Sequence, residues 1–143
     1  MKVTFCGHGG ITYSDDIRER LKEAVTELIA QGADEFLFGG YGSFDMLAAH
    51  TVYELKKEYR NIKSVLVVPY LNREYDMDWY DDSVFPPLER VPKRYAIVRR
   101  NYWMVEQSDV LVCYIDHAWG GAYRTFERAK AKKKRIIQLG VGL

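Results

Sequence analysis

The feature that most constrains the fold of this chain is an alternation of short apolar runs with helical patterns. The runs Lys2–Cys6, Glu35–Phe38 and Ser64–Val68 are rich in β-branched and aromatic residues, and the first two stop at a glycine. Helical apolar patterns separate them, which is typical of a parallel sheet covered by helices on both faces. We therefore expect an α/β protein, a Rossmann-like three-layer α/β/α sandwich with a mostly parallel sheet of about five strands.

The remaining elements follow from the same patterns. Ser14 is placed to cap the first helix, whose apolar face repeats every three to four residues before Gly32 ends it. Two further strands are expected at Val110–Ile115 and Arg135–Leu139. The other helices are expected at about Ser43–Tyr59, Ile97–Gln107 and Ala122–Lys133.

The segment 70–95 interrupts this rhythm within what we expect to be one domain, residues 1–143. It holds three of the four prolines together with several acids and aromatics. A connection of this length is usually functional or mobile. Its residues Tyr75, Trp79 and Tyr80 are expected either to stack on a ligand as a lid or to cover the sheet edge or a subunit interface.

Composition excludes several classes of protein. The formal net charge is +1, and no basic cluster suggests nucleic-acid binding. No apolar run approaches the roughly 20 residues of a membrane span, and no signal peptide is apparent, so we expect a cytoplasmic protein. Cys6 and Cys113 have no metal-ligand spacing and are expected to be small buried hydrophobes.

Glycines gather where the predicted strands end. Gly7–Gly10 follows the first strand, Gly39–Ser43 the second, and Gly120–Gly121 the run Val110–Ile115. In an open α/β sheet these ends share one edge, where backbone N–H groups and helix N-termini bind phosphates. None of the loops fits GxGxxG or GxxxxGK[ST], so tight turns alone could explain each glycine. Three such loops at one edge favour an extended anionic ligand.

The candidate ligand contacts lie in these loops and beside them. We expect the ligand-binding residues to be Gly7, His8, Gly9, Gly39, Gly40, Gly42, Ser43, Asp45, Tyr70, Glu74, Arg100, Asn101, Gly120, Gly121 and Thr125. For Asp45, stabilisation of its own helix N-terminus is an equally good explanation. His50 and His117 lack partners at metal-ligand spacing, so we expect no metal, and no cofactor beyond the ligand.

Several motifs, in order along the chain, resemble a known family. They are Phe5-Cys6-Gly7-His8, Phe38-Gly39-Gly40, Phe44-Asp45-xx-Ala48-Ala49, Pro69-Tyr70, Arg100–Val105, Ser108-Asp109 and Gly120-Gly121-xxx-Thr125. Together they are similar to the YpsA-like branch of the SLOG superfamily, related to LOG phosphoribohydrolases and DprA. The resemblance implies a Rossmann-like domain that binds or processes nucleotide-derived molecules. Family members usually carry arginine after the Gly-His pair, where this chain has Gly9.

The resemblance leaves three functions open. The first is binding of a nucleotide or nucleotide-derived ligand, as a sensor or regulatory domain, and this is the one we favour. The second is hydrolysis of a nucleoside monophosphate as in the LOG enzymes, with Arg100 and Glu127 as the catalytic pair. Against it, Thr125 lies one residue later than the LOG threonine, and Trp119 replaces a proline. The third is a protein-interaction module without a ligand.

The expected partners follow from the first of these functions. They are a nucleotide-derived small molecule and further copies of the chain in a homo-oligomer, with no membrane and no direct nucleic-acid binding.

Overall fold

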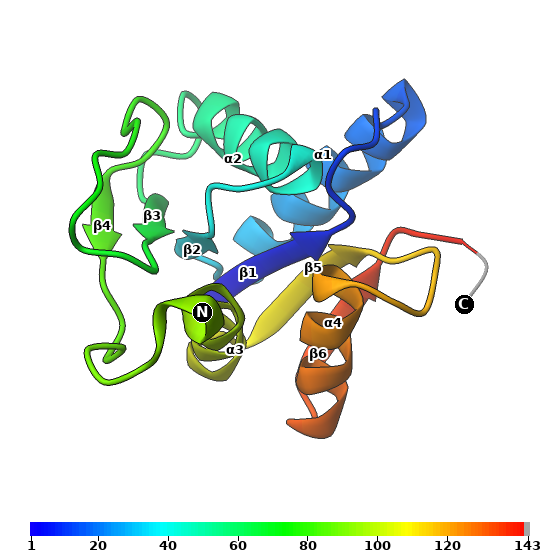
Figure 1. Cartoon of the computed structure of the whole chain (residues 1–143). Coiled ribbons are helices and arrows are strands. Elements are labelled where there is room, and N and C mark those ends of the chain that lie inside the picture. Colours follow the sequence, from blue (N-terminus) through cyan, green and yellow to red (C-terminus); the bar gives the residue numbers. More distant parts are fainter. Residues whose placement is uncertain (142–143) are drawn as a thin grey trace.

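The computed structural model describes residues 1–141 and shows a six-stranded sheet, all of whose strands are parallel (Figure 1). The strand order is β4-β3-β2-β1-β5-β6. The strands are β1 (Lys2–Gly7), β2 (Glu35–Phe38), β3 (Lys63–Val67), β4 (Asp82–Val84), β5 (Val110–Tyr114) and β6 (Arg135–Gln138). The helices are α1 (Asp15–Ala30), α2 (Ser43–Leu55), α3 (Ala96–Gln107) and α4 (Gly121–Ala131), with a 3₁₀ turn at Lys93–Tyr95.

Helices cover both faces of the sheet. In Figure 1, α1 and α2 lie on one face, and α3 and α4 lie on the other. The core under α1 and α2 includes the fully buried side chains of Phe36, Phe38 and Phe44. A smaller core under α4 includes Leu111 and Ile115. This three-layer Rossmann-like arrangement confirms the predicted fold class.

The sheet has one strand more than expected, β4, inside the segment predicted to be irregular. Its sequence, Asp-Ser-Val, carries no apolar run, because it is an edge strand that faces solvent. It forms through pairing with β3, in the register Val65↔Asp82. Asp81 helps to fix it, accepting a hydrogen bond of 2.8 Å from the Ser64 amide. No helix within residues 1–141 combines the length and apolar character needed to cross a bilayer.

The order of the strands identifies where a ligand is expected. From β1 the chain winds outward through β2, β3 and β4, and then returns to place β5 on the opposite side of β1. The winding direction therefore reverses between β1 and β5. In open α/β sheets, ligands bind outside the carboxyl ends of the strands at such a switch point.

Candidate functional site

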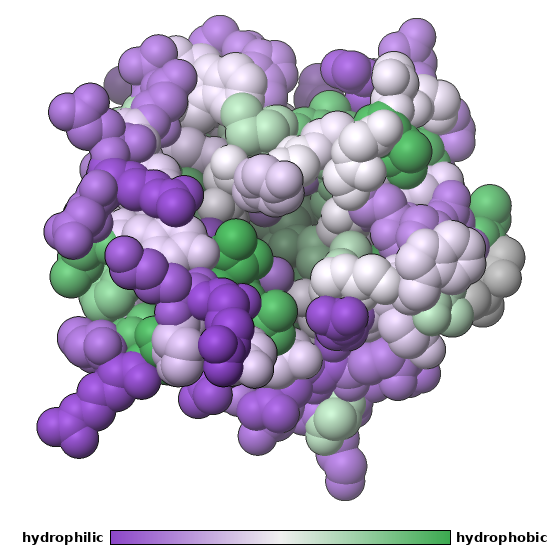
Figure 2. All heavy atoms as spheres, in the orientation of Figure 1, coloured by the Kyte–Doolittle hydropathy of each residue, from purple (hydrophilic) through white to green (hydrophobic). Residues whose placement is uncertain are grey.

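A cavity of about 420 Å³ lies at this switch point. Its walls come from the backbone after β1 and β2, from the start of α4, and from side chains of α3, including Arg100 and Met104. Figure 2 shows the surface hollowed near the middle of the view, with apolar atoms at the floor of the hollow. This volume is within the usual range for small-molecule sites, roughly 300–1,000 Å³.

Two helices begin at this cavity without a side-chain cap. Gly42 precedes α2 with φ 92°, and Gly120 precedes α4 with φ 93°; neither helix has a capping side-chain hydrogen bond. Such φ values strongly favour glycine. By contrast, Ser14 caps α1 by accepting a hydrogen bond of 3.3 Å from the Ile17 amide. The N-terminal N–H groups of α2 and α4 therefore have no capping side chain, and their positive dipole ends lie at the cavity.

The turn between β2 and α2 is fixed by two buried charged residues. The Asp45 carboxylate accepts hydrogen bonds from the Gly39 amide (3.3 Å) and the Gly40 amide (2.6 Å). Arg100 Nη1 donates to the carbonyls of Gly39 and Val67, each at 2.9 Å. Arg100 thus joins the carboxyl ends of β2 and β3, and Asp45 fixes the amides of the same turn.

Burial shifts the proton affinities of both groups. Desolvation raises the pKa of Asp45 to about 6, although the hydrogen bonds from Gly40 and Gly39 and the charge of Arg100 oppose the shift. Desolvation also lowers the pKa of Arg100, against the attraction of Asp45. The pair places a buried positive and a buried negative charge at the floor of the cavity.

The raised pKa of Asp45 predicts a specific pH dependence of stability. In the unfolded chain this carboxyl titrates near 3.8, so between that pH and about 6 the folded state binds the proton more tightly. The free energy of unfolding contributed by Asp45 therefore falls as the pH rises through this window. We expect lowering the pH from 7 to 5 to stabilise the wild type by about 1 kcal/mol more than Asp45→Asn.

Urea unfolding of both proteins at the two pH values measures this difference. Carboxyl groups elsewhere, such as Asp81 and Asp82, titrate in both proteins and cancel in the comparison. An identical pH dependence for the wild type and the variant would show that Asp45 has an ordinary pKa.

His8 links the loop after β1 to the loop after β5. Its side chain is buried, and its Nε2 accepts a hydrogen bond of 3.1 Å from the Asp116 amide. Its carbonyl accepts hydrogen bonds from the hydroxyls of Tyr13 (2.5 Å) and Ser43 (3.4 Å). Burial lowers the pKa of His8, and neighbouring His117 lowers it further. His8 is therefore neutral at pH 7, with the lone pair on Nε2.

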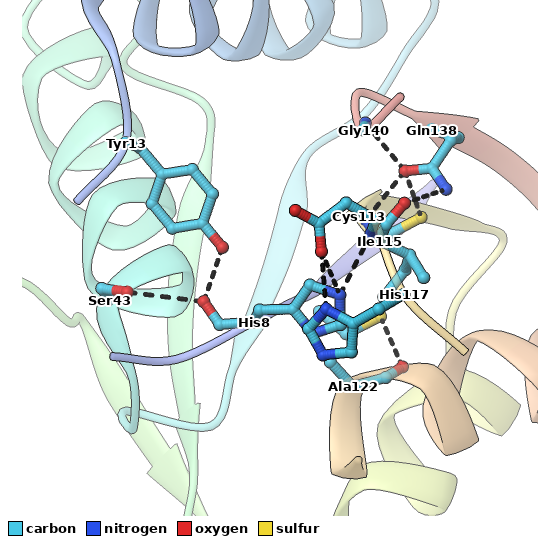
Figure 3. A network of polar contacts seen from close by, with 11 residues as sticks. His8, Tyr13, Ser43, Cys113, Ile115, His117, Ala122, Gln138 and Gly140 are labelled. Carbon is cyan, nitrogen blue, oxygen red and sulfur yellow. Dashed lines mark hydrogen bonds and ion pairs between the residues drawn. The ribbon is translucent and has the colours of Figure 1, made fainter. Parts of the chain in front are cut away.

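His117 lies directly against His8. The imidazole rings stack with centroids 3.5 Å apart and planes 13° apart, and Figure 3 shows them face to face. His117 Nδ1 lies 2.6 Å from Asp116 Oδ1. On its other side, His117 contacts Trp119, with ring centroids 4.0 Å apart. Two histidines and a carboxylate thus meet at the mouth of the cavity.

The rim of the cavity carries exposed apolar side chains. Trp119 is 69% exposed and Tyr41 is 82% exposed, and Ile11 and Ile97 are exposed beside them. Exposed aromatic rings next to a cavity are typical of sites that stack on a flat ligand.

Most of the predicted ligand contacts come together at this cavity. Those that line it are Gly7, His8, Gly9, Gly39, Gly42, Asp45, Arg100, Asn101, Gly120, Gly121 and Thr125. They come from four separate segments of the chain, which the parallel topology brings to one sheet edge. Arg100 and Asp45 also have the backbone-fixing role described above.

The other predicted contacts lie elsewhere. Ser43 donates to the His8 carbonyl, Tyr70 donates to the Lys93 carbonyl at 3.1 Å, and Glu74 is exposed to solvent. Gly40 faces a second cavity of about 210 Å³. That cavity is lined by aromatic residues of segment 70–95, namely Tyr75, Trp79 and Tyr80, so these rings do not cover the main cavity.

The two proposed catalytic residues are not assembled at one site. On α4, Gly121, Ala122 and Thr125 line the cavity, whereas Glu127 does not. Its carboxylate lies 3.3 Å from Lys130 Nζ, and its side chain is 44% exposed. Two residues after Thr125, a helical side chain points about 200° away from the cavity face. Arg100 is at the cavity, but its Nη1 is bonded to two backbone carbonyls.

Sequence reasoning missed part of the site. His117, Trp119, Tyr41 and Ile97 line the cavity but were not among the predicted contacts. His117 has no ligand partner at short sequence spacing except Asp116, and His8 lies 109 positions earlier. The sequence did contain one signal for this pair. Each of the two histidines follows a predicted strand, and the two strands end at the same edge of the sheet.

Comparison with known proteins gives relatives at low identity. The chain is 22% identical to the UPF0398 protein of Bacillus thuringiensis (strain Al Hakam), covering 84% of this chain and 72% of that protein. It is similar in structure to DNA processing protein A from Helicobacter pylori, with a TM-score of 0.66 and 17% identity, over 96% of this chain. The chain spans only 64% of that protein. The molybdenum cofactor carrier protein of Chlamydomonas reinhardtii gives a TM-score of 0.64 and 16% identity, over 96% of this chain and 74% of that one.

These neighbours correct the expected partners. The solved H. pylori protein has a single-stranded DNA binding mode, and the C. reinhardtii protein carries the molybdenum cofactor. The expected set of partners, a nucleotide-derived small molecule and further copies of the chain with no direct nucleic-acid binding, was therefore wrong in excluding nucleic acid, and the homo-oligomer is not shown. It relied on the net charge of the whole chain, which does not report on one cleft.

The family is shown by the match to a family model. The model YpsA, described as the YspA SLOG family, matches residues 12–84, which include α1, β2, α2, β3 and β4. The motifs that resembled this family from sequence extend beyond that segment into the cavity residues of α3 and α4. This chain belongs to the YspA SLOG family.

Proposed function

We propose that the cavity binds a phosphorylated nucleoside unit, with its phosphate at the helix N-termini and its base at the aromatic rim. The observation that carries this proposal is the pair of glycine-capped helices, α2 and α4, that begin at one cavity at the switch point of the sheet. A phosphate accepts hydrogen bonds from such N–H groups and is stabilised by the helix dipoles.

The start of α4 is the best place for the phosphate. A Cβ atom added at Gly120 or Gly121 would meet no atom within 4 Å, so there is open space over this backbone. The first turn of α4 contains no acidic residue, whereas that of α2 contains Asp45. The N–H groups of α4 therefore face open space without a competing carboxylate nearby in that turn.

The base fits the rim beside this helix. Trp119 immediately precedes Gly120, and its indole is largely exposed. Stacking of a base on an aromatic side chain contributes about 1–3 kcal/mol. The phosphate and base subsites are thus adjacent in sequence as well as in space.

A phosphorylated nucleoside unit occurs both in a free nucleotide and in a single-stranded nucleic acid. The H. pylori neighbour has a single-stranded DNA binding mode, which supports including the second source. The position of Glu127, paired with Lys130 outside the cavity, favours binding without hydrolysis of the glycosidic bond.

Isothermal titration calorimetry tests the proposal with two variants of one position. Gly121→Glu places a negative charge at the phosphate subsite, while an acidic residue in the first turn also favours the helix. We expect it to weaken binding of nucleoside 5′-monophosphates by at least about tenfold, or about 1.4 kcal/mol. Gly121→Gln has nearly the same size without the charge and is expected to weaken binding less.

Titrations with different ligands distinguish a free nucleotide from a single-stranded nucleic acid. The titrations use adenosine, guanosine, cytidine and uridine 5′-monophosphates, the parent nucleosides, and a single-stranded oligothymidylate. Tighter binding of monophosphates than of nucleosides supports a free nucleotide, and binding of the oligothymidylate alone supports a nucleic acid. Absence of binding in every arm, or equal binding by wild type and Gly121→Glu, contradicts the proposal.

A further inference from the structure

Three potential metal ligands converge at the mouth of the cavity, from the ends of β1 and β5. A nitrogen of His8, a nitrogen of His117 and a carboxylate oxygen of Asp116 all lie within 4.8 Å of one another. His8 Nε2 is 3.2 Å from Asp116 Oδ1, and His117 Nδ1 is 2.6 Å from the same oxygen. His8 and His117 line the cavity itself.

The distances are close to those around a bound ion. Nitrogen and oxygen ligands about 2.1 Å from one metal lie roughly 3.0 Å apart in octahedral and roughly 3.4 Å apart in tetrahedral coordination. The His8–Asp116 distance of 3.2 Å falls in this range, but the His8 and His117 rings are stacked with their planes 13° apart. His117 therefore has to rotate out of this stack and away from Asp116 before its nitrogen can point at an ion held by His8. Its side chain is 28% exposed at the cavity mouth and lies in a bend outside any helix or strand.

The hydrogen bonding of His8 selects the nitrogen that can bind a metal. Because Nε2 accepts a hydrogen bond from the Asp116 amide, this nitrogen carries the lone pair, and it lies 3.2 Å from the carboxylate of the same residue. A metal ion at Nε2 would replace the hydrogen bond from the amide by a ligand bond. The buried position of His8, held through its carbonyl by Tyr13 and Ser43, fixes one ligand before the ion arrives (Figure 3).

Little positive side-chain charge is available at the cavity. Among the described residues that line it, Arg100 is the only lysine or arginine, and its Nη1 and Nε are bonded to Gly39, Val67 and Asn101. A cation at the His8 cluster would add positive charge at the mouth of the cavity.

We propose that His8, Asp116 and His117 bind a divalent transition-metal ion of the zinc class at the mouth of the cavity. Two imidazoles and one carboxylate are a donor set suited to Zn²⁺, Co²⁺ or Ni²⁺ rather than to Mg²⁺ or Ca²⁺. Three protein ligands leave at least one position open for water or a ligand oxygen. Metal binding at this cluster does not depend on the proposed nucleotide, and it is measured without one.

Calorimetric titration with ZnCl₂, and absorption spectroscopy with CoCl₂, test this site. We expect the wild type to bind one equivalent, and His117→Ala to bind at least about tenfold more weakly. His50→Ala is the matched control, because His50 is an exposed histidine on α2 that contacts Glu54 and Trp79 and does not line the main cavity. It should leave the affinity unchanged.

A further variant distinguishes loss of a metal ligand from loss of folding, and the cobalt spectrum distinguishes histidine ligands from cysteine. His8→Gln removes the buried ligand, and circular dichroism shows whether the variant remains folded; His117→Ala carries the test if it does not. Cobalt bound here should lack the near-ultraviolet band of a sulfur ligand, which excludes Cys6. No binding by the wild type, equal binding by His117→Ala, or a sulfur band would overturn the proposal.

Discussion

Replacing Gly7 by alanine is expected to lower the free energy of unfolding by about 3 kcal/mol. A Cβ atom at this position would lie 2.5 Å from Cδ2 and 2.6 Å from Cβ of Phe44, with Cγ in contact as well. Phe44 is fully buried and packs edge-on against Tyr13, so its ring has no free space to enter. The added methyl group therefore forces either the last residue of β1 or the start of α2 to move.

Gly121→Ala is the matched control for this substitution. It adds the same methyl group to another cavity glycine, but there the Cβ meets no atom within 4 Å. Because alanine is the better helix former, we expect this variant to be as stable as the wild type or about 0.5–1 kcal/mol more stable. Urea unfolding of the three proteins gives the comparison, and equal losses for Gly7→Ala and Gly121→Ala would refute the packing explanation.

Replacing Arg100 by methionine is expected to cost about 3–5 kcal/mol of stability. The guanidinium bonds two backbone carbonyls that end β2 and β3, and it is the positive charge next to buried Asp45. Its loss leaves two carbonyls without their partner and Asp45 with an uncompensated negative charge. Arg100→Lys keeps the positive charge but lacks the planar guanidinium that bonds both carbonyls. We therefore expect it to lose less stability than Arg100→Met.

A neighbouring residue and a double variant check this interpretation. Arg99→Met removes an exposed arginine from the same helix turn and should change stability by less than about 0.5 kcal/mol. In the Asp45→Asn background, Arg100→Met should lower the free energy of unfolding by less than it does in the wild type. Asparagine is uncharged, so the substitution leaves no buried carboxylate without a positive partner. Equal costs in the two backgrounds would mean that Arg100 and Asp45 do not interact.

The fold could be predicted because its signals are local. The predicted runs became the mostly buried strands β1, β2, β3 and β5 and the partly buried edge strand β6, and Ser14 caps α1 as the sequence indicated. β4 could not be predicted in this way, because an exposed three-residue edge strand carries no apolar pattern. Its existence depends on pairing with β3.

The site could be predicted in position but not in the roles of its side chains. The glycines after β1, β2 and β5 identified the sheet edge, since parallel strands end together. Whether Arg100 faces a ligand or a backbone carbonyl depends on where Gly39 and Val67 lie, which are 61 and 33 residues away. The helical angle between Thr125 and Glu127 was available from sequence, and it indicated that only one of the two faces the cavity.

The histidine cluster shows the same limitation more clearly. Metal-ligand spacing rules apply to ligands within one segment, and His8 is separated from Asp116 by 108 residues. Only the pairing of β1 with β5, in the register Cys6↔Cys113, brings the two loops together. The prediction that no metal binds was made from spacing within single segments and did not consider this pair; it stays a prediction.

Backbone amide shifts in ¹H–¹⁵N spectra during titration with a nucleoside 5′-monophosphate test the central claim most directly. Binding at the switch point predicts the largest changes at Gly120–Ala122, with further changes at Gly7–Gly9 and Gly42, and at least about tenfold more ligand to reach half of these changes in Gly121→Glu. Changes confined to the second cavity around Trp79 and Tyr80, or no changes in residues 1–141 with either the monophosphate or the single-stranded oligothymidylate, would contradict it.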